Sequence, residues 1–302
     1  MKILFVLLGP TGVGKTALSI HIARHIGCPV ISADSRQIYK EMTVGTAAPA
    51  ESLRATVPHY FIATHSVTDY YSASLFEEEA LSLIIHLHKT HDHLLLCGGS
   101  MLYIDAVCKG IDEMPTVTQE IRDTLWKQYG ETGLESLLEE LQKSDPDHYE
   151  TVDRKNHRRV IHALEICRMT GKPYSSFCIR KIKTRPFKIF KIGLTRDRPA
   201  LFDRINSRVD EMINNGFVEE ARHLYPMRRL NALNTLGYKE LFAHFNHTYT
   251  LPEAVEKIKR STRIYARKQI SWFGRDPEIN WFNPDNKDDI IAYIDKVRCD
   301  SE

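Results

Sequence analysis

The stretch "ILFVLLGPTGVGKTALSI" (residues 3–20) decides the fold of this 302-residue chain. Six apolar residues end at Leu8, a glycine-rich turn follows, and Lys15 begins a segment with helical spacing of apolar residues. The turn fits the pattern Gly-x-x-x-x-Gly-Lys-Thr, and it lies between a strand and a helix, as a phosphate-binding P-loop does. Backbone N–H groups, the helix N-terminus and a lysine together favour a bound phosphate.

The sequence therefore predicts an anion site that holds a diphosphate or a nucleotide. Its expected members are Gly9, Pro10, Thr11, Gly12, Val13, Gly14, Lys15 and Thr16. Thr16 is also the expected protein ligand of a Mg²⁺ ion.

Short apolar strands alternate with helical patterns along the chain. We expect strands at 3–8, 29–33, 59–64, 93–99 and 187–194, with the first helix at 15–27. Such alternation predicts an α/β fold, a doubly wound parallel sheet of the P-loop class. Ligands of such sheets bind beyond the carboxyl ends of the strands, so the loops after Leu8, Ala33 and Cys97 are the places to look for chemistry.

About ninety residues between the fourth and fifth expected strands contain helical patterns and no convincing strand. They predict a helical insertion over 112–185, which divides a core domain made of 1–111 and 186–302. More helices follow the fifth strand within that core domain.

Charge is distributed unevenly along the chain. Residues 1–150 contain 11 Lys/Arg and 20 Asp/Glu, whereas residues 151–302 contain 30 and 19. A basic half suggests a polyanionic partner, although two differently solvated surfaces would give the same counts. The six cysteines form no Cys-x-x-Cys pair, no segment reaches transmembrane length, and the start lacks a signal-peptide cleavage site. We therefore expect a cytoplasmic protein without membrane association.

Nucleotide hydrolysis does not follow from the P-loop alone. The strongest apolar strand after it, "HLLLCGG", ends in glycines rather than in the aspartate that ATPases and GTPases use to hold magnesium. The carboxylate at a strand end is Asp34, in "VISADSRQIY". That position suits a group that holds an acceptor beside bound phosphates, and it equally suits the N-cap of a following helix.

Four stretches in order resemble the tRNA dimethylallyltransferase family, bacterial type: "GPTGVGKT", "ISADSRQIYKEMTVGTAAP", "CGGSMLY" and "RRVIHALEICRMTGK". Later segments agree, including "LGYKEL" and "TRIYARKQISWF", so the resemblance spans nearly the whole chain. It implies transfer of a five-carbon allyl group from dimethylallyl diphosphate to the exocyclic amine of the adenine 3′-adjacent to the tRNA anticodon. The P-loop would then hold the diphosphate as a leaving group.

The resemblance also implies roles for individual residues. Asp34 matches the catalytic aspartate, and Ser100 stands where the family usually has a threonine that faces the diphosphate; an N-cap role for Ser100 is compatible with this. The implied contacts with the tRNA anticodon stem-loop are Asp34, Ser35, Arg36, Gln37, Ser100, Arg122, Arg158, Arg159, Val160, Ile161, His162, Lys239, Arg267 and Lys268. His162 replaces the usual arginine, which predicts a weaker or pH-sensitive contact.

Two basic segments support an RNA partner. On a helix expected over 153–168, Lys155, Arg158, Arg159 and His162 share one face, while apolar residues form a separate stripe. Residues 257–268, "KIKRSTRIYARK", contain six basic residues and no acidic one. Aromatic residues near such a run suit stacked bases, although Tyr265 and Trp272 could equally belong to the core.

Three alternatives remain open at this point. A P-loop small-molecule kinase would use Asp34 to activate a hydroxyl, and an adenylate isopentenyltransferase would act on free AMP. A non-catalytic, nucleotide-driven RNA-binding switch would form no product. We expect a monomeric enzyme.

Overall fold

The computed structural model describes residues 1–179 and 181–300. They form two compact units, one made of Met1–Cys108 with the described part of Thr184–Glu302, the other of Lys109–Lys183. The second unit thus begins at Lys109 rather than at residue 112 and ends at Lys183 rather than at residue 185.

A six-stranded sheet forms the centre of the first unit, in the order β3-β2-β4-β1-β5-β6. All its pairings are parallel. The strands are β1 (Ile3–Leu8), β2 (Val30–Ala33), β3 (His59–Tyr60), β4 (His93–Gly98), β5 (Lys188–Leu194) and β6 (Ile279–Phe282). Leu8 and Ala33 both pair with Gly98, so the carboxyl ends of β1, β2 and β4 meet at one edge.

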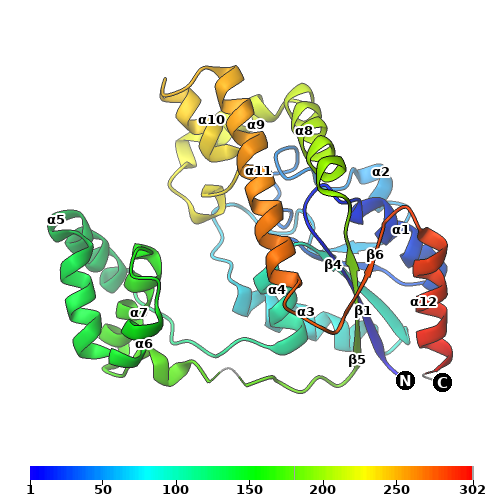
Figure 1. The fold of residues 1–302 in the computed structure, drawn as a ribbon, viewed down its shortest axis with the longest axis horizontal. Coiled ribbons are helices and arrows are strands. Elements are labelled where there is room, and N and C mark those ends of the chain that lie inside the picture. The colour runs from blue at the N-terminus through cyan, green and yellow to red at the C-terminus, as the bar shows by residue number, and fades with distance from the viewer. Residues whose placement is uncertain (180, 301–302) are drawn as a thin grey trace. The chain divides into compact units, whose positions relative to one another are not determined.

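Helices cover both faces of this sheet (Figure 1). The helices of the first unit are α1 (Lys15–Ile26), α2 (Glu51–Arg54), α3 (Ala73–Leu87), α4 (Met101–Lys109), α8 (Arg198–Asn214), α9 (Phe217–Leu224), α10 (Tyr238–Phe245), α11 (Leu251–Phe273) and α12 (Lys287–Cys299). Of these, α9 and α10 pack on each other, on α8 and on α11, away from the faces of the sheet. Phe76 of α3 stacks on Tyr103 of α4, with ring centroids 4.2 Å apart. Helix α12 packs beside α1. The alternation of strands and helices produces the α/β, doubly wound parallel sheet expected from the sequence.

The core of the first unit is built on the central strands. All six residues of β1 are buried, because β4 and β5 flank the strand and helices cover its faces. A strand in this position has no solvated face, which explains its unbroken apolar run.

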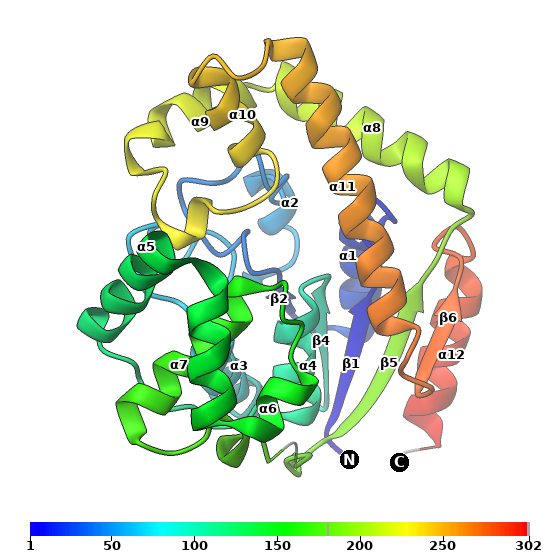
Figure 2. The same ribbon diagram turned by 60° about the vertical axis from the view of Figure 1, so that its left-hand side comes forward.

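The second unit is helical and has its own core (Figure 2). It contains α5 (Gln119–Ser144), α6 (Pro146–Thr151) and α7 (His157–Thr170). Gly133 interrupts α5 with φ 79° and ψ −169°, which separates the two helical patterns seen in the sequence. Buried Leu125, Leu141 and Leu164 pack together in its centre.

Two expectations about local structure are wrong, and one strand was not predicted. The third strand covers only His59–Tyr60, because Phe61 and Ala63 have φ values of 60° and 52°, which no strand adopts. The helix expected from residue 153 begins at His157, where the Asn156 side chain caps it, so Lys155 precedes the helix. Strand β6 was not expected, because its exposed Asn280 and Trp281 leave no apolar run.

Candidate active site

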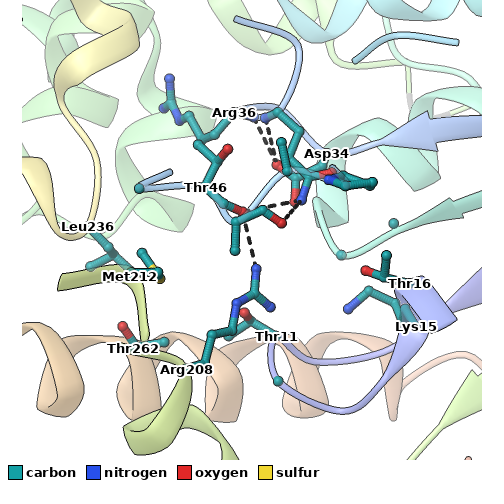
Figure 3. Close-up of a pocket in the computed structure, with 18 of the residues that line it drawn as sticks. Thr11, Lys15, Thr16, Asp34, Arg36, Thr46, Arg208, Met212, Leu236 and Thr262 are labelled. Carbon is teal, nitrogen blue, oxygen red and sulfur yellow. Dashed lines mark hydrogen bonds between the residues drawn. The ribbon is translucent and has the colours of Figure 1, made fainter. Parts of the chain in front are cut away.

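A cavity of about 960 Å³ lies at the carboxyl edge of the sheet, within the first unit. Its wall combines the P-loop, the loop after β2, the turn after β4, and parts of α8, α10 and α11. Figure 3 shows Lys15, Thr16, Asp34 and Arg208 around this space. The three loops singled out from the sequence therefore converge on one site.

Glycine is required within the P-loop for two reasons. Gly14 has φ 115°, a left-handed conformation that precedes the first turn of α1. At Gly12, φ is 79°, and a Cβ would lie 2.8 Å from Cγ1 of Ile205 on α8. The glycines thus let the loop curve tightly and let α8 approach it closely.

The Lys15 ammonium points back across the loop. Its Nζ donates to the carbonyl oxygens of Gly9 and Pro10, at 2.8 Å each. Burial lowers the pKa of Lys15 to about 8; the charge of Arg208 lowers it further, whereas Cys97 and Asp34 partly oppose this effect. Lys15 forms no salt bridge with any described residue, its bonded partners are carbonyl groups, and a bound anion would stabilise its charge.

Five of the eight expected P-loop residues line the cavity: Thr11, Gly12, Gly14, Lys15 and Thr16. Gly9, Pro10 and Val13 do not line the cavity, but their carbonyl groups accept hydrogen bonds from basic side chains around the loop. Arg196 donates to the Val13 carbonyl and Arg204 donates to the Gly12 carbonyl, at 3.0 and 2.9 Å. These bonds attach the P-loop to Arg196, just before α8, and to Arg204 within α8.

Asp34 caps a turn with one of its two carboxylate oxygens. Oδ1 accepts hydrogen bonds from the backbone N–H groups of Arg36 and Gln37, at 2.9 and 3.2 Å. No helix follows, so this is an Asx-type turn rather than the helix N-cap considered from the sequence. Oδ2 accepts no hydrogen bond from the described residues, and the half-buried carboxylate lines the cavity.

Ser100 joins the turn after β4 to the loop after β2. Its Oγ accepts from the Ser35 N–H at 2.8 Å and donates to the Ser35 Oγ at 3.1 Å. The Ser100 carbonyl accepts from the N–H groups of Tyr103 and Ile104, which begins α4. Ser100 therefore has a helix-start role in addition to its place in the cavity wall.

Arg36 and Gln37 also hold the loop in place. Nη1 of Arg36 donates to the carbonyl groups of Ala232 and Asn231, at 3.0 and 3.4 Å. Nε2 of Gln37 donates to the Thr46 carbonyl at 3.2 Å. Both side chains line the cavity, so they combine bracing of the loop with access to a ligand.

Arg208 is a site residue that the sequence analysis missed. It extends from α8 into the cavity, and one guanidinium nitrogen donates to the Thr46 carbonyl at 3.1 Å (Figure 3). Burial lowers the pKa of Arg208, and the charge of Asp34 partly opposes this effect. Like Lys15, it forms no salt bridge with any described residue. Its sequence signal is a lone arginine between Ile205 and Met212, on the inward side of an amphipathic helix.

Gln269 was also missed. This side chain of α11 is only 2% exposed, and its Oε1 accepts from the Thr11 N–H at 2.9 Å. The Thr11 amide is therefore occupied by protein, and the Val13 amide donates to the Pro10 carbonyl at 3.4 Å, so neither N–H is available to a ligand.

The expected RNA contacts on α7 divide into two groups. Arg158, Arg159 and His162 are exposed. The expectation that Val160 and Ile161 also offer their side chains to RNA is wrong, since both are buried in the core of the second unit. They lie on the opposite side of α7 and keep its basic face in place.

Arg122 and His162 share one buried carboxylate. Nε of Arg122 lies 3.2 Å from Oε1 of Glu165, and Nδ1 of His162 lies 3.4 Å from Oε2 of the same residue. The Glu165 side chain is 6% exposed, whereas that of His162 is 50% exposed. Both basic side chains are thereby oriented at the surface of the second unit.

The remaining expected RNA contacts belong to the first unit. Lys239 lines the cavity at the start of α10. Arg267 and Lys268 are exposed on α11, next to the buried Gln269.

The donor set near Thr16 fits a magnesium ion that is carried mainly by a substrate. Thr16 lines the cavity beside Lys15, and the described residues contain no group of three His, Cys, Asp or Glu that could hold a metal ion. Mg²⁺ in phosphate sites takes few protein ligands and keeps phosphate oxygens and waters. One hydroxyl is therefore sufficient here.

None of the helices within residues 1–179 and 181–300 is long and apolar enough to cross a membrane.

Comparisons with known proteins agree over nearly the whole chain. The sequence profile of the family described as IPP transferase matches residues 37–276. The chain is 60% identical over 294 residues to tRNA dimethylallyltransferase 2 of Parabacteroides distasonis, covering 97% of this chain and 98% of the relative. It is 54% identical to tRNA dimethylallyltransferase 1 of Phocaeicola vulgatus, with coverage of 97% and 98%.

Solved structures give the same result. The full-length tRNA isopentenylpyrophosphate transferase of Bacillus halodurans superposes with a TM-score of 0.73 and 31% identity, covering 100% of both chains. A eukaryotic dimethylallyltransferase described as acting on tRNA superposes with a TM-score of 0.79 and 26% identity. That match covers 94% of this chain and 74% of the eukaryotic one.

Proposed function

This chain belongs to the IPP transferase family, and on that premise we propose that it transfers a dimethylallyl group from dimethylallyl diphosphate to tRNA. The acceptor is the exocyclic amine of the adenine 3′-adjacent to the anticodon. The observation that carries the proposal is the arrangement of the cavity, where two half-buried cations, Lys15 and Arg208, and one carboxylate oxygen without a partner among the described residues face the same space. Cations suit a leaving diphosphate, and the oxygen suits an amine that must lose a proton.

The cations stabilise the leaving group. As the allylic C–O bond breaks, its electron pair goes to the diphosphate, and Lys15 and Arg208 neutralise the added charge. Both are held before the substrate arrives, so little reorganisation accompanies the reaction. Removing one preorganised donor of this kind typically lowers kcat by about 10²–10³-fold.

Asp34 activates the acceptor. The adenine amine is a weak nucleophile because its lone pair is delocalised into the ring. Oδ1 remains bonded to the turn, so Oδ2 can accept a hydrogen bond from the amine and take its proton as the new C–N bond forms. The target base must leave the stacked anticodon loop to reach this carboxylate.

We propose that Thr16 holds a Mg²⁺ ion together with diphosphate oxygens and water. When bound, the ion would add positive charge next to the departing diphosphate. Ser100, through its hydroxyl, would position the diphosphate or the reacting oxygen.

The RNA partner is the tRNA anticodon stem-loop. We propose contacts from the basic residues of α7 and α11, namely Arg158, Arg159, His162, Arg267 and Lys268, with Arg122 and Lys239 beside them. We also propose that the protein acts as a monomer in the cytoplasm, because one chain supplies every group of the cavity and the acceptor is tRNA.

A mass-spectrometric assay tests the reaction. Incubation of the protein with Mg²⁺, dimethylallyl diphosphate and unmodified tRNA should add one dimethylallyl group to a single adenine. Parallel reactions with AMP and with ATP test an adenylate isopentenyltransferase and a kinase. Prenylated AMP with unchanged tRNA, or ATP consumed with no prenylated product, would overturn the proposal.

A further inference from the structure

We infer that Gln269 is a positioning residue that sets the separation between the diphosphate site and Asp34. This inference rests on the proposed transfer reaction, and it concerns a side chain whose two amide atoms are both bonded to the backbone of the loops around the cavity. Gln269 lies on α11 and is 2% exposed, although a primary amide is costly to bury unless its polar atoms are bonded.

The Gln269 amide bridges two of the three loops that form the site. Oε1 accepts from the Thr11 N–H of the P-loop at 2.9 Å, and Nε2 donates to the Gly99 carbonyl at 2.7 Å. One amide group thus holds the loop after β1 and the turn after β4 at a defined distance.

The third loop is attached to the same bridge. Ser100 follows Gly99 directly and bonds to Ser35, which follows Asp34. Hydrogen bonds of Gln269 and of Ser100, joined by the peptide link between Gly99 and Ser100, therefore connect the P-loop to the loop of the proposed base. A side chain in the middle of this connection controls the alignment of leaving group and base.

The space around Gly99 shows how closely this bridge is packed. A Cβ at Gly99 would lie 2.6 Å from Nε2 of Gln269, and 3.2 and 3.4 Å from Gly9 O and Lys15 Nζ. Gly99 does not have a left-handed φ, so its backbone would accept an alanine. Because Nε2 is the nearest of these atoms, a methyl group added at residue 99 would displace the Gln269 amide first.

The cradle for the diphosphate does not itself depend on Gln269. Lys15 bonds to Gly9 and Pro10, while Arg196 and Arg204 bond to Val13 and Gly12. Loss of the bridge should therefore leave diphosphate binding largely intact and disturb the alignment of the two reacting groups. A misplacement of about 1 Å lowers the rate by about 10²-fold, so the effect should fall on kcat.

A double-mutant cycle tests the inference. Gln269→Leu removes both hydrogen bonds, and Gly99→Ala pushes the amide away while leaving it present. We expect each variant to lower kcat by about 10–100-fold. Because both act through the same bridge, the double variant should be no slower than Gln269→Leu alone. The Kd values for Mg²⁺-pyrophosphate and for an anticodon stem-loop RNA should stay near those of the wild type.

Trp272→Phe is the matched control. It removes the 2.8 Å hydrogen bond from Trp272 Nε1 to Asp105, another anchor of α11 that involves none of the three loops. We expect its kcat to remain at the wild-type value. If Gln269→Leu does not fold, Gln269→Glu replaces it in the cycle, since it keeps an acceptor for the Thr11 amide and loses only the donor to Gly99.

The outcomes separate the inference from the proposed function. Additive losses in the double variant, a wild-type kcat in Gln269→Leu, or an equal loss in Trp272→Phe would each overturn the role of Gln269. A wild-type protein that transfers nothing to tRNA would overturn the proposed function and this inference with it.

Discussion

The two carboxylate oxygens of Asp34 differ in their bonding, and this difference decides how its proposed role as a base should be tested. Oδ1 is bonded to the N–H groups of Arg36 and Gln37, whereas Oδ2 accepts nothing from the described residues. A change that removes the whole carboxylate would alter both the turn and the proposed chemistry. A variant that keeps an acceptor oxygen at the Oδ1 position separates the effect on the turn from the effect on the proposed chemistry.

We expect Asp34→Asn to lower kcat by about 10²–10⁴-fold, because an amide can still accept from the turn but cannot take the proton of the amine. Thermal unfolding and RNA affinity should match those of the wild type. Asp34→Ala is the comparison, and it should also lose about 0.5–1.5 kcal/mol of stability with the hydrogen bonds of the turn. Near wild-type turnover in Asp34→Asn would rule out the base.

Lys15 should make donor binding depend on pH. In the free protein the pKa of Lys15 is lowered to about 8, mainly by burial. A bound diphosphate favours the charged lysine and raises its pKa, so binding above pH 8 must be accompanied by proton uptake. We expect the affinity for dimethylallyl diphosphate to fall as the pH rises through this range.

Calorimetry in buffers of different ionisation enthalpy measures that proton uptake. Lys15→Met is the control, because it keeps the titration of the ligand itself and removes the lysine. Equal proton uptake in Lys15→Met and in the wild type would contradict the assignment of the uptake to Lys15.

The lowered pKa of Lys15 also affects the stability of the folded protein. Between pH 8 and the ordinary pKa near 10.5, the folded protein binds fewer protons than the unfolded chain, so Lys15 makes stability rise with pH.

At the scale of elements, α7 shows how one helix serves both a core and a proposed RNA surface. Its buried side packs Val160, Ile161 and Leu164 into the second unit, and its exposed side carries Arg158 and Arg159. Asn156 begins the helix by accepting a hydrogen bond from the Arg159 N–H. Since the two sides are distinct, they should respond to different measurements.

We expect Arg158→Ala and Arg159→Ala each to weaken RNA binding and to reduce the slope of log Kobs against log salt by about 0.7–0.9 for each lost phosphate contact. Binding isotherms at several salt concentrations give that slope. An unchanged slope in both variants would remove α7 from the RNA interface.

Ile161→Ala is the matched variant on the buried side of α7. It should destabilise the second unit by about 2–5 kcal/mol without changing the salt slope under conditions where the unit remains folded. A reduced slope in folded Ile161→Ala protein would show that Ile161 contributes to RNA binding despite its burial.

At the scale of the whole molecule, the chain consists of two units that each have a hydrophobic core. The backbone enters and leaves the second unit at neighbouring positions, since the Lys183 N–H donates to the Lys109 carbonyl at 2.8 Å. The cavity and all its lining residues belong to the first unit. We therefore expect that dimethylallyl diphosphate binds to the first unit even when the second unit, with its proposed RNA contacts on α7, is removed.

Replacing residues 110–182 by a short Gly-Ser linker tests this separation. We expect the shortened protein to fold and to bind Mg²⁺-pyrophosphate as the full chain does, because the P-loop and its supports are all retained. Its affinity for the anticodon stem-loop should fall strongly, since the basic face of α7 is lost. Unchanged RNA affinity would place the RNA contacts on the first unit alone, and a failure to fold would show that the cores depend on each other.

The sequence by itself determined the features that depend on neighbours along the chain. A buried strand needs an unbroken apolar run, and a P-loop needs glycines at set spacings before a lysine. The sheet, the turn between β1 and α1 and the position of Asp34 at a strand end could therefore be predicted. Exposed Arg158 and Arg159 followed from helical spacing in the same way.

The tertiary structure alone decided which distant groups complete the site. Arg208 and Gln269 come from helices about two hundred residues or more beyond the P-loop, and helical spacing can place such a residue on the inward side of its helix without showing which cavity it enters. Likewise, only packing showed that Val160 and Ile161 face the core and that Arg36 braces a loop. The physical reason is that burial and long-range hydrogen bonding depend on which elements come together in space, and spacing along the chain does not encode that directly.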